Sequence, residues 1–326
     1  MSQGEMNQEQ QEPSGRSVWD EVCSRLPQQH WPAPALYVVA TPIGNLADFS
    51  PRAWFALSRA DVIAAEDTRS TRVLLDAWRI QAELLSVHRH NERDRLQQIL
   101  ERLSQGQKVA LVSDAGAPGV SDPGGVLIQA VREHGYPVVG IPGPSAVIAT
   151  LMSFGTTTDE QPGFTFLGFL PQKSGQRRKL LEQWSSYSGT IICFEAPHRL
   201  QSSLKDMLEV FGSERQIGLA RELTKRFEQT VMMTMESAVQ WVNSDRHHLQ
   251  GEYVLLIPSS QSGSSRRQDV DESGVSLQAW AKALLEHVST RDAAKVMSKA
   301  TGKSRDECYA LLLEISAHRD RGHDAD

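Results

Sequence analysis

The sequence predicts two α/β domains followed by a small helical domain, and three observations lead to this prediction. Short apolar runs alternate with segments of helical periodicity from Leu36 onward, as in domains built on a mainly parallel sheet. The breaker-rich segment at 155–163 interrupts this alternation, which then resumes. A stretch rich in Ser and charge at 259–274 separates the last apolar run from a tail with helical spacing.

These breaks divide the chain into successive parts. We expect a disordered extension at 1–34, α/β domains at 35–155 and 164–258, a linker at 259–275 and a helical domain at 276–318. The extension is rich in Gln, Glu, Ser and Pro and lacks the apolar core of a signal peptide. We therefore do not expect it to direct secretion.

The overall composition narrows the classes of function. Of the 326 residues, 40% are hydrophobic and 23% are charged, as is usual for soluble globular proteins. The three cysteines are widely spaced and odd in number, which argues against a disulfide framework and favours the reducing cytoplasm. No apolar run reaches the roughly 18 residues of a membrane span. The net charge is −6, so any contact with nucleic acid must depend on local basic patches.

The first domain begins with the run LYVVA at 36–40, which is apolar throughout, as expected for a strand buried on both faces. Ser50 followed by Pro51 predicts a helix start, because Ser caps the first turn and Pro is tolerated at the first helical position. Asn91 is expected to cap a later helix with apolar residues at helical spacing up to Leu103. The other strands of this domain are expected at 61–67, 84–88, 108–114 and 137–143.

The second domain and the tail follow the same logic. In the tail, Ser304 with Glu307 three residues later forms a capping box for the last helix, and Gly302 is expected to end the helix before it. Such a unit is compatible with a helix-turn-helix that binds nucleic acid and with a packing or dimerisation domain, which we favour. The strands of the second domain are expected at 164–170, 190–196, 216–223 and 251–257.

Candidate ligand-binding loops follow the strands of the first domain. Gly, Pro, Asp and Ser gather directly after the apolar runs, at 40–50, 113–125 and 141–146. In open α/β sheets, ligands bind at this edge, beyond the carboxyl ends of the strands. The loop at 113–125 holds four Gly, two Pro and two Asp, more than a plain turn needs. We therefore expect it to be shaped around a ligand.

Other binding motifs are not supported. None of these loops contains the G-x-G-x-x-G pattern of a dinucleotide site. The GKS at 302–304 lies between predicted helices, and Met297 stands where a phosphate-binding loop requires Gly. His88, His90 and Cys193 lack the spacing of a zinc site, so no metal is expected.

A series of ordered motifs resembles the ribosomal RNA small subunit methyltransferase I family of the tetrapyrrole methylases. The motifs are VATPIGNLADFS, AAEDTR, HRHNE, SDAGAPGVSDPG, PGPSA, GFLPQK, FEAPHR and ARELTK. The resemblance runs from about Leu36 to Ile257 and includes the helical tail, and it leaves roughly the first 33 residues outside. It implies two α/β domains of the tetrapyrrole-methylase (class III methyltransferase) type, with S-adenosylmethionine bound in the cleft between them.

The resemblance also implies an activity and a set of donor-binding residues. The family it resembles methylates the ribose 2′-hydroxyl of a cytidine in small-subunit (16S) ribosomal RNA, so S-adenosylmethionine, this RNA and a homodimer are the implied cofactor and partners. A methyl donor needs backbone N–H and C=O groups around its polar edges, and loops of Gly and Pro expose such groups. Carried over position by position, the residues that would face the donor are Pro42, Ile43, Gly44, Asp114, Ala117, Ser145, Ala146, Phe194, Ala220 and Glu252.

The general base for such a transfer is not identified by the sequence. Methyl transfer to a hydroxyl requires in-line alignment and removal of one proton. Asp67 is also explained as a helix cap, and a single strand-end His is often structural. Ionisable residues near strand ends are Glu66, Asp67, His88, Glu92, Glu195 and Glu222, and we retain Glu66, Asp67, His88 and Glu195 as candidate catalytic residues.

Candidate RNA-binding residues are polar or basic side chains that follow strand ends. They are Asn45, Arg69, Asn91, Arg199, Arg221, Lys225 and Arg226. The densest basic run, Lys173, Arg177, Arg178 and Lys179, is either a phosphate-binding track or a solvated helix face.

Two other functions remain compatible with the sequence. The same scaffold would suit methylation of a tetrapyrrole or corrinoid precursor, although EDTR, HRHNE and FEAPHR resemble the RNA branch. A non-catalytic RNA-binding or assembly factor would keep the fold, but the intact Gly- and Pro-rich loops argue against it.

Overall fold

The computed structural model describes residues 15–88, 91–159, 161–259, 277–285, 287–302 and 304–320. The chain forms two compact units, one ending at Ser259 and one beyond it. The first contains both α/β domains, and the second contains the helical tail.

The described helices α1 to α12 are Gly15–Ser24, Pro51–Ser58, Thr68–Ala77, Glu92–Ser104, Gly125–Glu133, Ala146–Phe154, Ser174–Trp184, Pro197–Phe211, Met235–Ser244, Leu277–Leu285, Thr290–Thr301 and Arg305–Asp320. The strands β1 to β10 are Ala35–Val39, Val62–Ala65, Glu83–Ser86, Lys108–Val112, Val138–Ile141, Phe164–Phe169, Thr190–Glu195, Gln216–Arg221, Gln229–Thr234 and Tyr253–Ile257. Short 3₁₀ helices η1 to η3 lie at Leu26–Gln28, Leu46–Asp48 and Arg246–Leu249.

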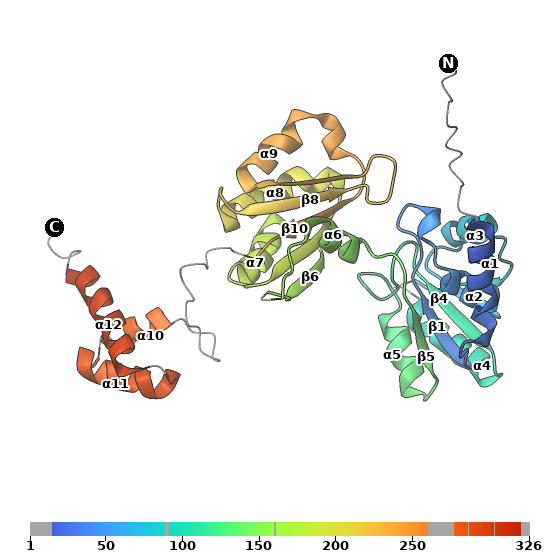
Figure 1. Ribbon diagram of the computed structural model, residues 1–326. Coiled ribbons are helices and arrows are strands. Elements are labelled where there is room, and N and C mark those ends of the chain that lie inside the picture. Colours follow the sequence, from blue (N-terminus) through green and yellow to red (C-terminus); the bar gives the residue numbers. More distant parts are fainter. Residues whose placement is uncertain are drawn as a thin grey trace, which may run out of the picture. The chain divides into compact units, whose positions relative to one another are not determined.

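The first sheet is parallel throughout, with the strand order β3-β2-β4-β1-β5 (Figure 1). Successive residues of its strands face two helical layers, as expected for strands buried on both faces. Tyr37 packs in the layer of α2 and α3, with Leu57. Leu36 packs in the layer of α4 and α5, with Ile99 and Leu127. The expected strands and the parallel α/β architecture of this domain are confirmed.

The second sheet is mixed, with the order β6-β7-β10-β8-β9. Only β6 and β7 run parallel, and the other neighbours are antiparallel. Leu181 of α7, Leu204 of α8 and Val242 of α9 pack on one face of this sheet. The edge strand β9 was not predicted, because its continuous apolar run, from Val231 to Met233, is only three residues long.

Helix α6 packs on the second sheet, although the sequence placed it in the first domain. Val147 and Leu151 share an apolar cluster with Val254 of β10. The first domain was expected to end at residue 155, whereas α6, at Ala146–Phe154, packs with residues of the second sheet. The predicted breaker at Gly155 is instead the left-handed residue that ends α6.

The extension predicted to be disordered over 1–34 is corrected for its described part. Residues 15–34 contain α1 and η1, and Leu26 is only 2% exposed. Trp31 donates a hydrogen bond from Nε1 to the Leu26 carbonyl (2.7 Å) and packs 4.9 Å from the Phe55 ring of α2. Apolar packing on α2 thus orders this segment, whose composition alone favoured disorder. Residues 1–14 and the part of the expected linker after Ser259 lie outside the described residues.

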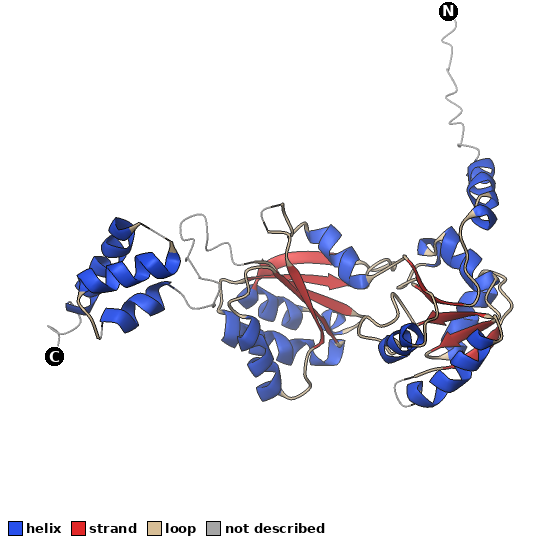
Figure 2. Ribbon diagram, turned by 90° about the horizontal axis from the view of Figure 1, so that it is seen from below, coloured by secondary structure: helices blue, strands red, loops and turns tan. Residues whose placement is uncertain are grey.

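The tail is a three-helix unit formed by α10, α11 and α12 (Figure 2). Its core contains Ala293, Met297 and Leu312. The Ser304 hydroxyl accepts from the Glu307 backbone N–H, and the Glu307 carboxylate accepts from the Ser304 backbone N–H, which confirms the capping box. Gly302 ends α11 in the left-handed conformation, also as predicted. Among the described helices of the whole chain, none is long and apolar enough to cross a membrane.

Candidate active-site cavity

A cavity of about 440 Å³ lies between the two α/β domains, at the carboxyl ends of the first sheet's strands. This volume is within the range of small-molecule and cofactor sites. The first domain contributes residues that follow β1, β2 and β4, and α6 contributes its first turn. The second domain contributes residues at the ends of β6, β7, β8 and β10. The cavity therefore lies at the edge where the loop composition predicted a ligand.

Backbone contacts join the loops of the first domain into one wall. Thr41 and Gly116 exchange two backbone hydrogen bonds, of 2.9 and 3.0 Å, and so connect the loop after β1 to the loop after β4. Gly116 has a φ of +79°, a conformation that favours glycine. The Asp67 N–H donates to Asp114 Oδ1 (3.1 Å), which ties the end of β2 to the same loop. The wall is thus built largely from backbone and short side chains.

A lysine side chain of the second domain packs against the first domain at one end of this wall. Lys225 Nζ donates to Glu222 Oε1 (2.9 Å) and to Glu252 Oε2 (3.0 Å). A Cβ on Gly44 would lie 2.6 Å from Lys225 Cγ, so only glycine allows this approach. Burial alone would raise the pKa of Glu222, but its bonds to Lys225 and the Glu252 N–H outweigh burial and lower it. Glu222 is held there at a positive φ of +50°.

The charged residues that line the cavity, within the described part of the chain, are all acidic. They are Glu66, Asp114, Asp122, Glu195 and Glu252. Tyr253 also lines it, and burial raises its pKa to about 12, so this phenol stays protonated near neutral pH. An acidic lining favours a cationic ligand over an anionic one.

Most of the expected donor-facing residues come together around this cavity. Pro42 and Gly44 do not line it, and Gly44 instead packs against Lys225. The remaining eight all line it, namely Ile43, Asp114, Ala117, Ser145, Ala146, Phe194, Ala220 and Glu252.

The candidate catalytic residues separate into different environments. Glu66 is half-buried and lines the cavity. Asp67 does not line it and caps α3, where the Arg69 side chain and N–H lower its pKa to about 2. His88 lies at the end of β3, away from the lining, and its backbone N–H donates to Asn91 Oδ1 (2.7 Å).

Glu195 lines the cavity as a residue, but its carboxylate is fully buried. It accepts from the Ala196 N–H (2.8 Å), the Arg199 guanidinium (2.7 Å) and the Ser203 hydroxyl. Glu92, also considered above, accepts from the Gly124 and Leu127 N–H groups and so holds the start of α5. Both carboxylates have structural contacts that explain their positions.

Several expected RNA-binding side chains are engaged in local structure. Asn45 accepts from the Ala47 N–H, and Asn91 donates to the Ser86 carbonyl. Arg221 Nε donates to the Gln250 carbonyl (2.8 Å).

Two of the residues expected to bind RNA are exposed cations, and they lie in different domains. Arg69 is 90% exposed, although it pairs with Asp67. Arg226 is exposed beside the Phe227 ring, in the loop between β8 and β9. Arg199 is by contrast largely buried and Lys225 is held by two carboxylates, so neither is well placed to meet a phosphate.

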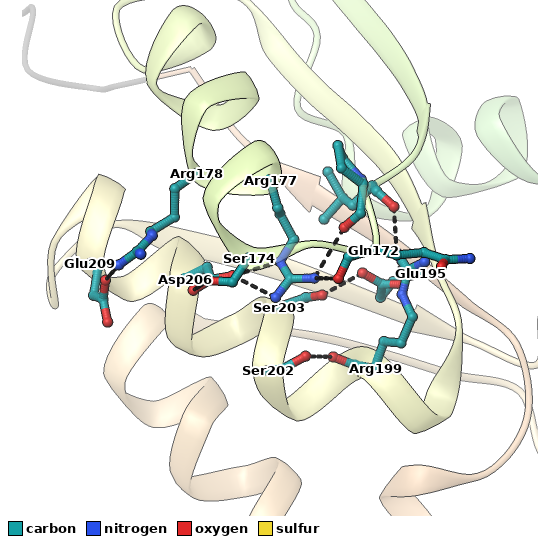
Figure 3. A network of polar contacts seen from close by, with 12 residues as sticks. Gln172, Ser174, Arg177, Arg178, Glu195, Arg199, Ser202, Ser203, Asp206 and Glu209 are labelled. Carbon is teal, nitrogen blue, oxygen red and sulfur yellow. Dashed lines mark hydrogen bonds and ion pairs between the residues drawn. The ribbon is translucent and has the colours of Figure 1, made fainter.

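The basic run of α7 is not a continuous phosphate track. Figure 3 shows Arg177 directed into the domain, where it pairs with Asp206 (2.5 Å), while Arg178 pairs with Glu209 nearer the surface. The Arg177 side chain is 3% exposed. Lys173 and Lys179 remain exposed. Helical periodicity explains the split, because neighbouring residues on a helix point in different directions.

Sequence reasoning missed several residues of the cavity. Phe169 and Tyr253 belong to strands that are largely apolar, and such a pattern does not indicate which side chains face a cleft. Asp122 lies in the predicted ligand-binding loop at 113–125 but was not among the residues expected to face the donor. Within the described residues, no group of three or more His, Cys, Asp or Glu is arranged to hold a metal ion.

Comparison with known proteins agrees with this architecture. The family model of Tetrapyrrole (Corrin/Porphyrin) Methylases matches residues 35–239, and the RsmI C-terminal HTH domain matches residues 271–316. A Neisseria meningitidis serogroup B protein named ribosomal RNA small subunit methyltransferase I is 44% identical, over 85% of this chain and 92% of its own length. The chain belongs to the ribosomal RNA small subunit methyltransferase I family.

Other members of this family and more distant structures are consistent with that assignment. The Vibrio cholerae protein of the same name is 45% identical, over 69% of this chain and 77% of its own. The solved structure of cobalt precorrin-4 methyltransferase, a cobalamin biosynthetic enzyme, superposes with a TM-score of 0.53 at 15% identity, covering 69% of this chain and 94% of its own. This structural likeness shows the shared fold.

Proposed function

We propose that this protein transfers the methyl group of S-adenosylmethionine to the ribose 2′-hydroxyl of a cytidine in small-subunit ribosomal RNA. As a member of its family it is an S-adenosylmethionine-dependent methyltransferase of small-subunit ribosomal RNA. The cytidine and the 2′-oxygen are the finer part of the proposal and rest on the ordered motifs from β1 to β8.

The acidic cavity is the observation that carries the proposal. S-adenosylmethionine bears a positive sulfonium, a good leaving group, and an ammonium group. Asp114 and Glu66 contribute carboxylates that attract a cation of this kind, whereas the lining carboxylate of Glu252 already pairs with Lys225. Phe194 and Ala220 supply an apolar wall suited to an adenine ring. The residues present therefore fit this donor.

Glu66 is our choice for the group that receives the hydroxyl proton. It is half-buried at the end of β2 and lines the cavity, whereas Asp67 and His88 do not. The Glu195 carboxylate is fully buried and so does not face the cavity. A carboxylate beside the bound ribose would accept the 2′-proton as the oxygen attacks the methyl carbon.

The decisive experiment incubates the protein with labelled S-adenosylmethionine and small ribosomal subunits from methylation-deficient cells. The expected result is label in the RNA and one phosphodiester linkage that resists alkali, because a 2′-O-methyl group removes the internal nucleophile. Label on a base, or none in RNA, would contradict the proposal. A parallel reaction with a tetrapyrrole precursor tests the alternative substrate on the same fold.

Substitution of Glu66 tests the proposed base. Glu66→Gln is expected to lower kcat by about 10²-fold or more, while calorimetry finds the donor still bound. Glu66→Asp, which keeps a carboxylate, should recover part of the rate. An unchanged kcat in Glu66→Gln would leave positioning alone as the source of catalysis.

We further propose that the protein acts in the cytoplasm as a homodimer. Ile148 and Met152 of α6 are exposed, as is Met232 of the neighbouring strand β9. Exposed apolar side chains of this kind favour a protein interface. Sedimentation equilibrium should give twice the chain mass, and a monomer at micromolar concentration would refute the dimer.

A further inference from the structure

An irregularity in β6 directs a large aromatic side chain toward the cavity. The register between β6 and β7 shifts between Phe166 and Phe169, and Gly168 has a φ of +69°. Such bulges turn side chains toward new directions and occur beside active sites. Phe169 lines the cavity yet remains 59% exposed. An aromatic ring this exposed has most of one surface available to a ligand.

Two arginines hold the segment that follows Phe169 by its backbone carbonyls. Arg199 donates to the Leu170 carbonyl, and Arg177 Nη1 donates to those of Pro171 (3.1 Å) and Gln172 (3.4 Å). Figure 3 shows both guanidinium groups converging on this segment from α7 and α8. We call Arg177 and Arg199, with the carbonyls they hold, the arginine clamp.

The arginine clamp is buried and is itself held by carboxylates. The Arg177 and Asp206 side chains are 3% and 8% exposed, and the Arg199 and Glu195 side chains are 17% and 0% exposed. Ser174 donates to Asp206 Oδ1 (2.9 Å). Burying ion pairs costs desolvation energy and seldom increases stability over apolar packing. Precise placement of residues 170–172, and thus of Phe169, is a gain that would offset this cost.

The surroundings of Phe169 suit a flat ligand at the outer part of the cavity. Its ring meets Phe194 edge to face, at 5.3 Å and 65°. Phe194 is half-buried, while Phe169 is mostly exposed, so Phe169 forms the outer wall. Val120 of the first domain also lines the cavity and is 43% exposed. The donor's adenine fits the deeper wall, which leaves the Phe169 face for the second substrate.

We propose that Phe169 is the surface on which the base of the target nucleotide stacks, with Arg177 and Arg199 as positioning residues that set its orientation. The inference rests on the proposed function, because the planar ligand it names is a base of the RNA substrate. Proteins commonly read single-stranded RNA by stacking unpaired bases on aromatic side chains. A base held on Phe169 would keep its own ribose close to the inner part of the cavity.

The first test separates RNA binding from donor binding. Phe169→Ala is expected to raise KM for the small subunit by about 5- to 100-fold, from the usual loss on removing one base-stacking ring. Phe169→Tyr should keep the KM for RNA near the wild-type value, because it retains an aromatic ring. Phe169→Leu should raise this KM as Phe169→Ala does, because an aliphatic side chain offers no aromatic face on which a base can stack. The donor Kd should stay unchanged in all three variants. A weakened donor Kd with unchanged KM for RNA would instead assign the ring to the donor and overturn the proposal.

The second test asks whether the clamp acts through Phe169. Arg199→Lys keeps the charge beside Glu195 but cannot reach the same carbonyl with a planar fork. It should raise KM for RNA in the wild-type background and have little further effect in Phe169→Ala. Arg178→Ala is the control, because Arg178 follows Arg177 in the chain but pairs with Glu209 outside the clamp. It should leave the KM for RNA unchanged. Independent, multiplicative effects of Arg199→Lys and Phe169→Ala would refute the positioning role.

These outcomes separate failure of the inference from failure of the proposed function. If the wild-type protein places no label in subunit RNA, the function itself fails. If the wild-type protein labels RNA and Phe169→Ala does so with an unchanged KM for RNA, only the stacking role fails. Melting temperatures measured for every variant identify any loss of fold, and the Tyr and Lys variants test both roles with conservative changes.

Discussion

The two walls of the cavity are built in different ways. The first domain presents loops of Gly, Pro and Asp whose backbones are bonded to one another, as in the Thr41–Gly116 bridge. The second domain presents aromatic rings on strands, and the arginine clamp holds the segment after β6 by hydrogen bonds from side chains to backbone carbonyls. One wall therefore depends on backbone conformation and backbone hydrogen bonds, and the other depends on side-chain contacts and buried ion pairs. Substitutions in the two walls should therefore differ in their effects on stability and on donor binding.

The largest expected loss of stability comes from a substitution in the wall of the second domain, which depends on side-chain contacts. Arg177→Ala leaves Asp206 buried without its partner, so the free energy of unfolding should fall by about 3–5 kcal/mol. Arg178→Ala removes an exposed pair with Glu209 and should cost no more than about 1 kcal/mol. Urea unfolding of both variants measures the difference. Equal losses at these adjacent positions would show that burial of the pair does not matter.

A glycine pair tests the backbone-dependent wall. Gly116 and Gly106 have similar positive φ values, +79° and +83°, but only Gly116 lines the cavity. Alanine at either position should cost roughly 1–2 kcal/mol of stability, from the strain of the left-handed conformation. Only Gly116→Ala should also weaken donor binding, by about tenfold, or roughly 1.4 kcal/mol. Calorimetric titration decides, and equal donor affinity in the two variants would remove this loop from the site.

The smallest expected effect concerns the charges where the walls meet. The pKa of Glu222 is lowered in the folded protein, so its contribution to stability is present above its unfolded pKa and is lost as pH falls through the lower folded value. Unfolding measured between about pH 5 and pH 2 should therefore show a steeper acid decline in the wild type than in Glu222→Gln. Asp67 titrates in the same window but is common to both proteins, so it cancels. Parallel curves would mean that Glu222 adds nothing to stability.

The parts of the fold set by local pattern were predictable. Continuous apolar runs identified the strands of the first sheet, and cap residues such as Ser50 and Ser304 marked helix starts. The Gly- and Pro-rich loops pointed to the edge of the sheet at which the cavity lies, because strand ends in a parallel sheet share one side. Strand β9 was missed because its apolar run is short, and the packing of α6 was missed because it depends on contacts with β10, far along the chain.

The candidate site was predictable to a lesser degree. Asp114 and Ala146 line the cavity as the resemblance implied, but nothing in the local pattern distinguished Asp67, a helix cap, from Glu66 beside it. Arg199 looked like a phosphate ligand until its carboxylate partner was in view. A charged residue's role depends on what lies opposite it, and that partner is often far along the chain.

By itself, the sequence determined the α/β class, the described strands other than β9, the helical tail and the loops that form the backbone wall. These follow from periodicity, capping and glycine conformation, which act over a few residues. Only the tertiary structure decided which sheet α6 covers, that Arg177 is buried while Arg178 is not, and that Phe169 faces the cavity. Those outcomes depend on apolar packing between distant elements, on ion pairs between two helices and on a bulge, and such contacts exist only once the chain has folded.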